Sequence, residues 1–313
     1  MHTITSRQNP LVTLFRAVAR GRPAAGPRML LDGPHLVREA LAAGVAMSHA
    51  AFSTRGFDAP EIRSLATALE RAGVAVHVVS DAVMDAISPV AAPAGVVAVG
   101  DRPAMSAATV FERRPQLVLI GAGIQDPGNV GAMVRAAEAG GATGVVFAGA
   151  SADPFGWKAL RGAMGSAFRV PIAADAGIDR IVDAARASGA RVLAAAPRGG
   201  RSVFEVDLRG PVAFLLGGEG PGLDTALTRA ADEVVVVPMH PPVESLNVAV
   251  AAALLIYEAY RQRHSSPDRG PRTSGSRSSP SPPRRDGHTG PASRPSENRR
   301  TRSVPGGRPP RTR

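Results

Sequence analysis

The second half of the chain alternates continuous apolar runs with stretches of helical periodicity. From Gln116 onward, each short apolar run is followed by a segment in which apolar residues recur every three or four positions. Continuously apolar strands separated by helices are typical of a parallel sheet that helices cover on both faces. We therefore predict an α/β fold with a parallel sheet here. The expected strands are QLVLIGAG (116–123), GVVFAG (144–149), RVLAAAP (191–197), PVAFLLGG (211–218) and EVVVVPM (233–239).

Residues 28–100 repeat this rhythm in shorter units. The stretch MLLDGPHLVREALAAGV predicts a strand, a turn around Gly33 and an amphipathic helix that Gly44 stops. A short helix is expected before it, at Pro10–Ala19. We interpret this part as a small, separate α/β domain. The predicted division is residues 1–104 for this N-terminal domain, 105–115 for a linker, 116–263 for the larger α/β domain and 264–313 for a tail.

Charge is concentrated in that tail. The whole chain carries a formal net charge of +11, and the tail holds 12 arginines against three acidic residues, so only +2 remains for residues 1–263. The tail is rich in Arg, Pro and Ser and nearly lacks aliphatic and aromatic residues, which predicts disorder. An Arg-rich tail can hold RNA phosphates without sequence preference. A passive extension explains it equally, because the chain has 36 Arg and a single Lys, Lys158.

Several classes of site are disfavoured by composition. The chain has no cysteine, so it has no disulfide, thiolate metal site or cysteine nucleophile. Its seven histidines show no metal-ligand spacing, and we expect no metal. The N-terminus lacks the apolar core of a secretory signal, and no apolar run is long enough to span a membrane. We therefore expect a cytoplasmic protein.

The loop and helix DPGNVGAMVRAAEAGG, residues 126–141, form the first candidate for chemistry. Asp126 is suited to cap the helix and Pro127 to its first position, and Gly140-Gly141 is expected to stop it. Gly131 lets another backbone or a ligand come close, and Arg135 lies four residues further on the same face. An ordinary helix with one exposed arginine remains the alternative for this segment taken alone.

The second candidate is LLGGEGPGLD, residues 215–224, where four glycines follow a buried strand within six positions. Such a loop indicates close approach of the backbone to a ligand or to other backbone. It lacks the lysine of a phosphate-binding Walker loop. The stretch GAGIQD at 121–126 also fails as a dinucleotide fingerprint, because Asp126 stands where the third glycine belongs.

The third candidate is HPPVESLNVAVAAALLIYEAY, residues 240–260. Glu244, Ser245 and Asn247 stand at the entrance of the most apolar helix, which Ser245 or Asn247 opens. Capping explains one such polar residue. A ligand site at the carboxyl ends of adjacent parallel strands explains all three.

Together these segments resemble the SpoU/TrmH family of RNA ribose 2′-O-methyltransferases, in the SPOUT superfamily. NVGAMVRAA is similar to its first motif, LLGGEGPGL to its second and VPMHPPVESLNVAVAAALLIYE to its third, in the same order. The resemblance implies a parallel-sheet methyltransferase domain with a C-terminal trefoil knot. Through LDGPHLVREALAAG it also implies an L30-like N-terminal domain that binds the RNA substrate.

By this resemblance, the second and third motifs hold S-adenosylmethionine between them. Implied cofactor-binding residues are Leu216, Gly217, Gly218, Gly220, Val237, Pro238, Met239 and Leu246. Implied catalytic residues are Arg135, Asn129, Glu219, Ser245 and Asn247. At position 218 many relatives carry Asn, Ser or Ala, so any side-chain contact from there is lost.

The resemblance also implies attack of a ribose 2′-oxygen on the methyl group of the cofactor. The family assigns proton removal to the motif-one arginine, here Arg135, held by Asn129. Because arginine stays protonated in proteins, anchoring a phosphate and stabilising charge on oxygen is the alternative role for Arg135. We expect a homodimer acting on structured RNA, most readily ribosomal RNA. The alternatives are a transfer-RNA methyltransferase of the same family and a non-catalytic knotted RNA-binding or ribosome-assembly factor.

Overall fold

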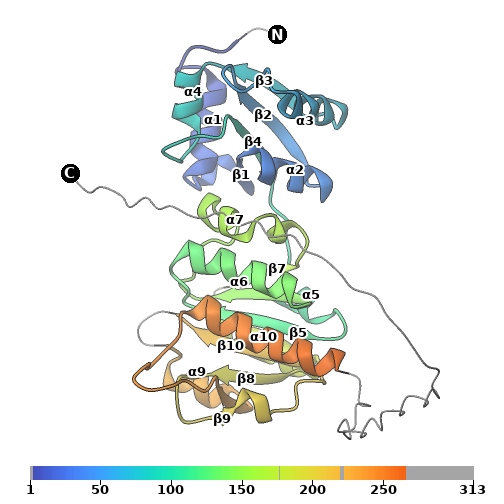
Figure 1. Cartoon of the computed structure of the whole chain (residues 1–313), viewed down its shortest axis with the longest axis vertical. Helices are drawn as coiled ribbons and strands as arrows, with labels where there is room; N and C mark the ends of the chain where they lie inside the picture. Colours follow the sequence, from blue (N-terminus) through green and yellow to red (C-terminus); the bar gives the residue numbers. More distant parts are fainter. Residues whose placement is uncertain (1–2, 176, 219–221, 266–313) are drawn as a thin grey trace, which may run out of the picture. The chain divides into compact units, whose positions relative to one another are not determined.

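The computed structural model describes residues 3–175, 177–218 and 222–265. These residues belong to one compact unit, Met1–Ser266, built around two β-sheets (Figure 1). The predicted site residues Glu219 and Gly220 lie outside the described residues, as does nearly all of the predicted tail. Among the helices described, none is both long and apolar enough to cross a membrane.

The N-terminal sheet has four strands in the order β1-β4-β2-β3. Strands β1 and β2 both run antiparallel to β4, and β3 runs parallel to β2. Alternate residues point to opposite faces: Leu31 packs with α2 and α3, whereas Leu30 packs with α1 and α4. The elements are α1 (Pro10–Ala19), η1 (Pro23–Ala25), β1 (Arg28–Asp32), α2 (Pro34–Ala42), β2 (Met47–Ser53), α3 (Pro60–Arg71), β3 (Ala75–Val79), α4 (Asp81–Ile87) and β4 (Val96–Asp101).

The second sheet has seven strands, all paired in parallel, in the order β7-β6-β5-β10-β8-β11-β9. The predicted parallel α/β architecture is therefore confirmed. Its elements are α5 (Ala107–Phe111), β5 (Leu117–Ala122), α6 (Pro127–Ala139), β6 (Gly144–Ala148), α7 (Trp157–Ala163), η2 (Ser166–Phe168), β7 (Ile172–Asp175), α8 (Ile178–Ala187), β8 (Arg191–Ala195), β9 (Arg201–Ser202), η3 (Val203–Glu205), β10 (Val212–Gly217), α9 (Thr225–Ala230), β11 (Glu233–Val236) and α10 (Val248–His264).

Helices cover both faces of this sheet. On one face, α6 and α10 lie beside each other and bury apolar residues such as Met133 and Leu255 against Leu119 and Phe214 (Figure 1). On the other face, α5 and α8 pack on the alternate strand residues, including Ile120. The segment 105–115, interpreted from sequence as a linker, contains α5 and so contributes to the hydrophobic core on this face of the sheet.

The first-motif helix α6 has the ends that its sequence predicts. Asp126 is its N-cap, accepting hydrogen bonds from the backbone N–H groups of Gly128 and Asn129 at 2.6 and 3.0 Å. In the middle of the helix, a Cβ on Gly131 would overlap the carbonyl oxygen of Ala159 in α7. The predicted close approach at Gly131 is thus one between two helix backbones, and it fixes α6 against α7.

Candidate active site

A cavity of about 450 Å³ opens at the carboxyl ends of β8, β10 and β11. The strands β10 and β11 flank β8, and the segment following each strand contributes to the wall. Open parallel sheets bind ligands at the carboxyl ends of their strands, and the volume of this cavity suits a small molecule. The lining residues are Ala195, Ala196, Pro197, Leu216, Gly217, Gly218, Gly222, Leu223, Thr228, Val237, Met239, Ser245, Leu246, Asn247, Val248, Ala251 and Leu255.

The second-motif loop approaches its own chain so closely that two of its glycines admit no side chain. A Cβ on Gly217 would overlap the backbone of Gly222 and Leu223, where the loop returns. A Cβ on Gly218 would overlap the carbonyl oxygen of Gly123, in the loop after β5. Glycine at position 218 is therefore required by its neighbour Gly123, and the loops after β5 and β10 pack backbone against backbone.

The third motif begins α10 with Asn247. Its Oδ1 accepts hydrogen bonds from the backbone N–H groups of Ala249 and Val250, at 2.9 and 3.3 Å, and so caps the helix. Its Nδ2 donates to Oδ1 of Asn129 at 3.0 Å. Of the two residues that the sequence left open as the start of the helix, Asn247 is the cap, and Ser245 instead lines the cavity.

The Asn247–Asn129 contact brings the first and third motifs together. Asn129 lies in the first turn of α6, where its own backbone N–H binds the Asp126 cap. One asparagine side chain thus joins the N-termini of two helices at the edge of the cavity. Because helix N-termini carry partial positive charge, this corner favours electron-rich groups such as ribose and phosphate oxygens.

Arg135 lies apart from the cavity lining. Its side chain is exposed on α6 and makes no hydrogen bond or ion pair with any residue that the structure describes. Within this single chain, the structure therefore assembles Asn129, Ser245 and Asn247, but it does not bring Arg135 to the cavity. Glu244, also noted in the sequence, is exposed and forms an ion pair with Arg198 at 3.1 Å.

Most of the implied cofactor-binding residues line the cavity. Those that do are Leu216, Gly217, Gly218, Val237, Met239 and Leu246, whereas Pro238 does not. Sequence reasoning missed the wall formed by Ala195, Ala196 and Pro197. RVLAAAP predicts the strand, but only the strand order, with β8 between β10 and β11, places the end of that strand in the site.

The cavity is largely apolar and carries no ionisable side chain among its described lining residues. Ser245, Asn247 and Thr228 supply its polar side chains. In the part of the chain that the structure describes, no cluster of His, Asp or Glu could hold a metal ion. An apolar cavity with glycine-exposed backbone and a few polar groups fits a ligand with a flat ring and a ribose, as in S-adenosylmethionine.

Comparison with known proteins agrees with this geometry. Residues 116–257 match the model of the SpoU rRNA Methylase family, and residues 30–105 match that of RNA 2′-O ribose methyltransferase substrate binding. A tRNA/rRNA methyltransferase of Synechocystis sp., itself uncharacterised, is 32% identical over 267 residues, covering 83% of this chain and 94% of that protein. The chain belongs to the SpoU rRNA methylase family. The resemblance inferred from the three motifs is therefore confirmed.

Two relatives carry more specific descriptions. RlmP of Bacillus subtilis (strain 168), a 23S rRNA (guanosine(2553)-2′-O)-methyltransferase, is 35% identical over 229 residues, which cover 73% of this chain and 86% of RlmP. The crystal structure of an AdoMet-bound rRNA methyltransferase from Sinorhizobium meliloti superposes with a TM-score of 0.75 at 28% identity, covering 85% of this chain and 99% of that one. Both relatives are matched over nearly their whole length, so the similarity includes the N-terminal domain.

Proposed function

We propose that this chain transfers the methyl group of S-adenosylmethionine to a ribose 2′-hydroxyl of ribosomal RNA. The observation that carries the proposal is the cavity at the carboxyl ends of β8, β10 and β11, with the Asn129–Asn247 pair at its edge. Membership of the SpoU family and the AdoMet-bound relative support the cofactor. RlmP supports ribosomal RNA as the substrate class.

The cofactor occupies the cavity in this proposal. When bound, S-adenosylmethionine supplies an electrophilic methyl group on a sulfonium sulfur. Its adenine and ribose are held by backbone groups of residues that line the cavity. These residues are Leu216, Gly217, Val237, Met239 and Leu246. The apolar, uncharged lining excludes water from the reacting centre.

The polar residues at the cavity edge then orient the RNA ribose. Ser245 and Asn247 line the cavity, and Asn247 is hydrogen-bonded to Asn129 of the first motif. Holding the 2′-oxygen in line with the methyl group supplies much of the rate. Arg135 binds the adjoining phosphate and stabilises charge on the oxygen, since a guanidinium remains protonated. The proton of the 2′-hydroxyl passes to water at the open side of the cavity, where Ser245 and Asn247 are exposed. Glu219, outside the described residues, has the proposed role of orienting neighbouring polar groups.

A homodimer completes this site in our proposal. One face of α10 packs on the sheet, but the opposite face exposes Val250, Leu254 and Tyr257, at helical spacing of four and three residues, by 48%, 40% and 49%. An apolar stripe on a helix that begins at the site favours packing against a second copy. Since Arg135 does not line the cavity of its own chain, a partner subunit can supply it.

The remaining architecture follows the family in this proposal. Residues 1–104 form an L30-like domain that binds the RNA, 105–115 connect it, and 116–263 form the methyltransferase domain with a trefoil knot beneath the cavity. Residues 264–313 are the basic tail. In this proposal the enzyme works in the cytoplasm.

Two measurements test the proposed function. Calorimetry determines whether the purified chain binds S-adenosylmethionine, and we expect micromolar affinity. Mapping of 2′-O-methyl groups in RNA from cells with and without the gene then identifies the nucleotide. Methylation found in transfer RNA alone contradicts the ribosomal substrate. Absence of cofactor binding favours a non-catalytic RNA-binding factor instead.

A further inference from the structure

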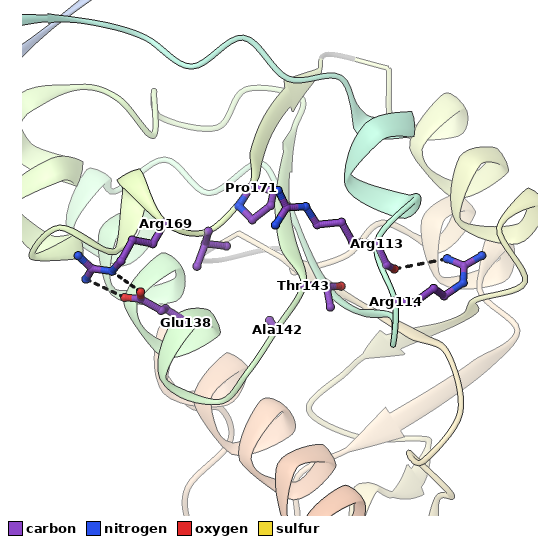
Figure 2. A pocket seen from close by; sticks show the side chains of 8 residues that line it. Arg113, Arg114, Glu138, Ala142, Thr143, Arg169 and Pro171 are labelled. Carbon is purple, nitrogen blue, oxygen red and sulfur yellow. Dashed lines mark hydrogen bonds and ion pairs between the residues drawn. The ribbon is translucent and has the colours of Figure 1, made fainter. Parts of the chain in front are cut away.

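A second cavity, of about 500 Å³, lies at the amino ends of strands in the large sheet (Figure 2). Its lining residues immediately precede three neighbouring strands, β5, β6 and β7. Because the strands are parallel, these amino ends lie across the sheet from the candidate active site. The lining residues are Arg113, Arg114, Glu138, Ala142, Thr143, Arg169, Val170 and Pro171.

One wall of this cavity is rigid and carries no net positive charge. Arg169 forms paired hydrogen bonds with the carboxylate of Glu138 (Figure 2), one of them 3.0 Å long from Nη2 to Oε2. It also forms an ion pair with Glu39. Two carboxylates therefore compensate its charge and fix its guanidinium. A small ligand gains little attraction from this wall, but it meets a preorganised surface.

The other wall carries uncompensated positive charge. The side chain of Arg113 is exposed, extends toward Pro171 and has no hydrogen bond or ion pair with any described residue (Figure 2). Arg114 donates to the carbonyl oxygens of Phe111 and Ser188, at 2.9 and 3.1 Å. Carbonyl groups orient its guanidinium without neutralising it. The charge of Arg113 thus faces the concave surface, and the charge of Arg114 lies on the outer side of the same wall (Figure 2).

The chemistry of this surface fits a phosphate group. A guanidinium presents N–H donors in a planar fork that matches phosphate oxygens. The lining includes no aromatic residue on which a base could stack. We propose that this cavity binds phosphodiester groups of the RNA backbone, at a distance from the methylated nucleotide. The inference rests on the proposed function, because it takes RNA as the substrate.

Such a contact positions RNA and raises affinity without reading sequence. The two cavities lie at opposite ends of the strands. Since β5 has six residues and a strand rises about 3.3 Å per residue, the sites lie at least roughly 20 Å apart. That span corresponds to several nucleotides. We therefore expect the contact to act on the binding of RNA and to leave methyl transfer within the bound complex unchanged.

The test measures RNA affinity of the full chain over a series of salt concentrations, using an rRNA fragment that contains the methylated nucleotide. The slope of log affinity against log salt is negative, and each lost phosphate contact reduces its magnitude by about 0.7–0.9. Arg113→Ala should reduce affinity several-fold and reduce the magnitude of the slope by roughly one, with kcat and S-adenosylmethionine affinity unchanged. Arg113→Lys should restore part of the affinity because it keeps the charge. Arg114→Ala is compared after its melting temperature has been checked.

Arg229→Ala is the matched control, since Arg229 is an exposed arginine of α9, outside the proposed RNA-binding domain, without an ion pair to any described residue. An equal loss of slope in this control overturns the proposal, because total charge alone then explains the effect. A wild-type slope in Arg113→Ala also overturns it. NMR titration with inorganic phosphate is a second readout. If Arg113→Ala loses phosphate binding but keeps the wild-type salt slope for RNA, the proposal is also overturned. If wild-type protein methylates no RNA, the proposed function fails, which is a separate outcome.

Discussion

Asn247 donates a hydrogen bond of 3.0 Å from its Nδ2 to Oδ1 of Asn129, which stands 118 positions earlier in the chain. The same side chain caps α10 through its Oδ1. One residue therefore both starts the last helix and ties it to the first-motif helix. The structure shows the cap and the contact with Asn129, and a role of Asn247 in methyl transfer is our proposal. Substitutions that keep the cap and remove the contact can separate the two.

We expect Asn247→Ser to keep the helix cap and to lose activity. Serine is a good N-cap, but its short side chain cannot reach Asn129. Melting temperature should stay near that of the wild type, while methyl transfer falls by about tenfold or more, the effect of a lost orienting contact. Asn247→Ala should lose activity and about 1 kcal/mol of stability as well. Equal stability losses in the two variants would contradict this division of roles.

Gly218→Ala should weaken cofactor binding. A Cβ there overlaps the carbonyl oxygen of Gly123, so the loop after β10 must move away from the loop after β5. Overpacking of this kind costs about 1–3 kcal/mol. Calorimetry should show at least a tenfold loss of S-adenosylmethionine affinity. Gly210→Ala is the control, because nothing lies within 4 Å of a Cβ at that position; an equal loss there would exclude the steric explanation.

Arg135→Lys should abolish most methyl transfer without affecting the fold. The side chain is exposed and bonds to no described residue, so stability should be unchanged. Lysine keeps the charge but lacks the planar fork, and loss of such a transition-state contact costs on the order of 100-fold in kcat. Single-turnover kinetics at saturating RNA provide the measurement. A variant with wild-type rate would remove Arg135 from the reaction.

Local signals in the sequence predict elements well when each end is marked. Asp126, Pro127 and Gly140 bound α6 as expected, because capping depends on neighbouring residues only. Short elements without such marks were missed. Strand β7 has four residues, and α9 buries none of its residues, so neither leaves a clear periodicity.

The residues of the site could be predicted only in part, because some of their contacts come from distant segments of the chain. The glycines of the second motif indicate close approach, but only the tertiary structure identifies Gly123 as the partner of Gly218. The wall at Ala195–Pro197 depends on the position of β8 between β10 and β11. Strand order is a non-local property, and hydrophobic pattern does not encode it.

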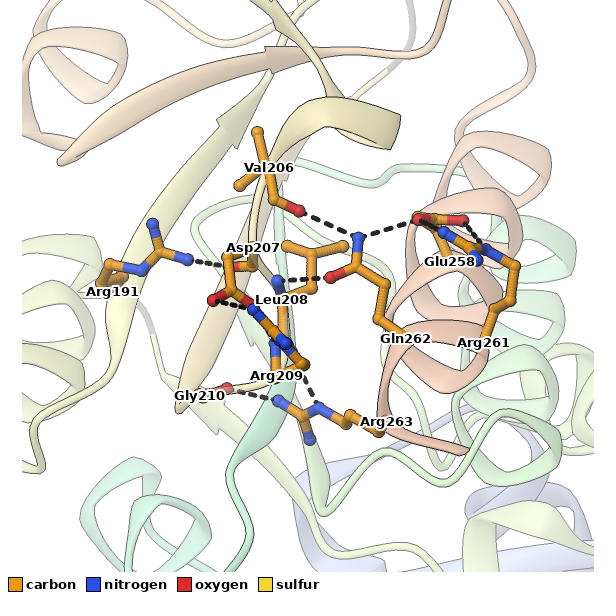
Figure 3. Close-up of polar contacts among 10 residues, drawn as sticks. All are labelled: Arg191, Val206, Asp207, Leu208, Arg209, Gly210, Glu258, Arg261, Gln262 and Arg263. Atoms are coloured by element: carbon orange, nitrogen blue, oxygen red, sulfur yellow. Dashed lines mark hydrogen bonds and ion pairs between the residues drawn. The ribbon is translucent and has the colours of Figure 1, made fainter. Parts of the chain in front are cut away.

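Arg263→Ala should destabilise the methyltransferase domain. Figure 3 shows the last turn of α10 bound to the segment before β10, and Arg263 donates to the carbonyl oxygens of Leu208 and Gly210 at 2.9 and 2.6 Å. It also donates to that of Gln116, at 2.8 Å. Removing this donor leaves the part-buried carbonyl group of Leu208 without its hydrogen bond, at a cost of about 1–3 kcal/mol.

Urea unfolding measures that loss, with Arg229→Ala as the matched control. Arg229 is exposed on α9 and bonds to no described residue, so its removal should change stability little. Neighbouring Gln262 also holds the segment, since its Oε1 accepts from the backbone of Leu208 at 2.8 Å and its Nε2 donates to Val206 at 2.9 Å (Figure 3). A wild-type unfolding midpoint for Arg263→Ala would mean that Gln262 alone suffices.

Stability of the N-terminal domain should fall in mild acid because of a histidine pair. His49 and His77 lie on adjacent strands, with Nδ1 and Nε2 3.2 Å apart. Burial, and secondarily the charge of His49, lower the pKa of His77 from its ordinary value of 6.5. The unfolded chain therefore binds more protons than the native protein once the pH falls below 6.5, so acidification favours unfolding until His77 is protonated in the folded state too.

Unfolding midpoints in urea at pH about 7.5 and about 5.5 should differ less in His77→Gln than in the wild type. His240→Gln, which removes an exposed histidine, should retain the full difference; equal pH dependence in wild type and His77→Gln would show that the pair contributes nothing.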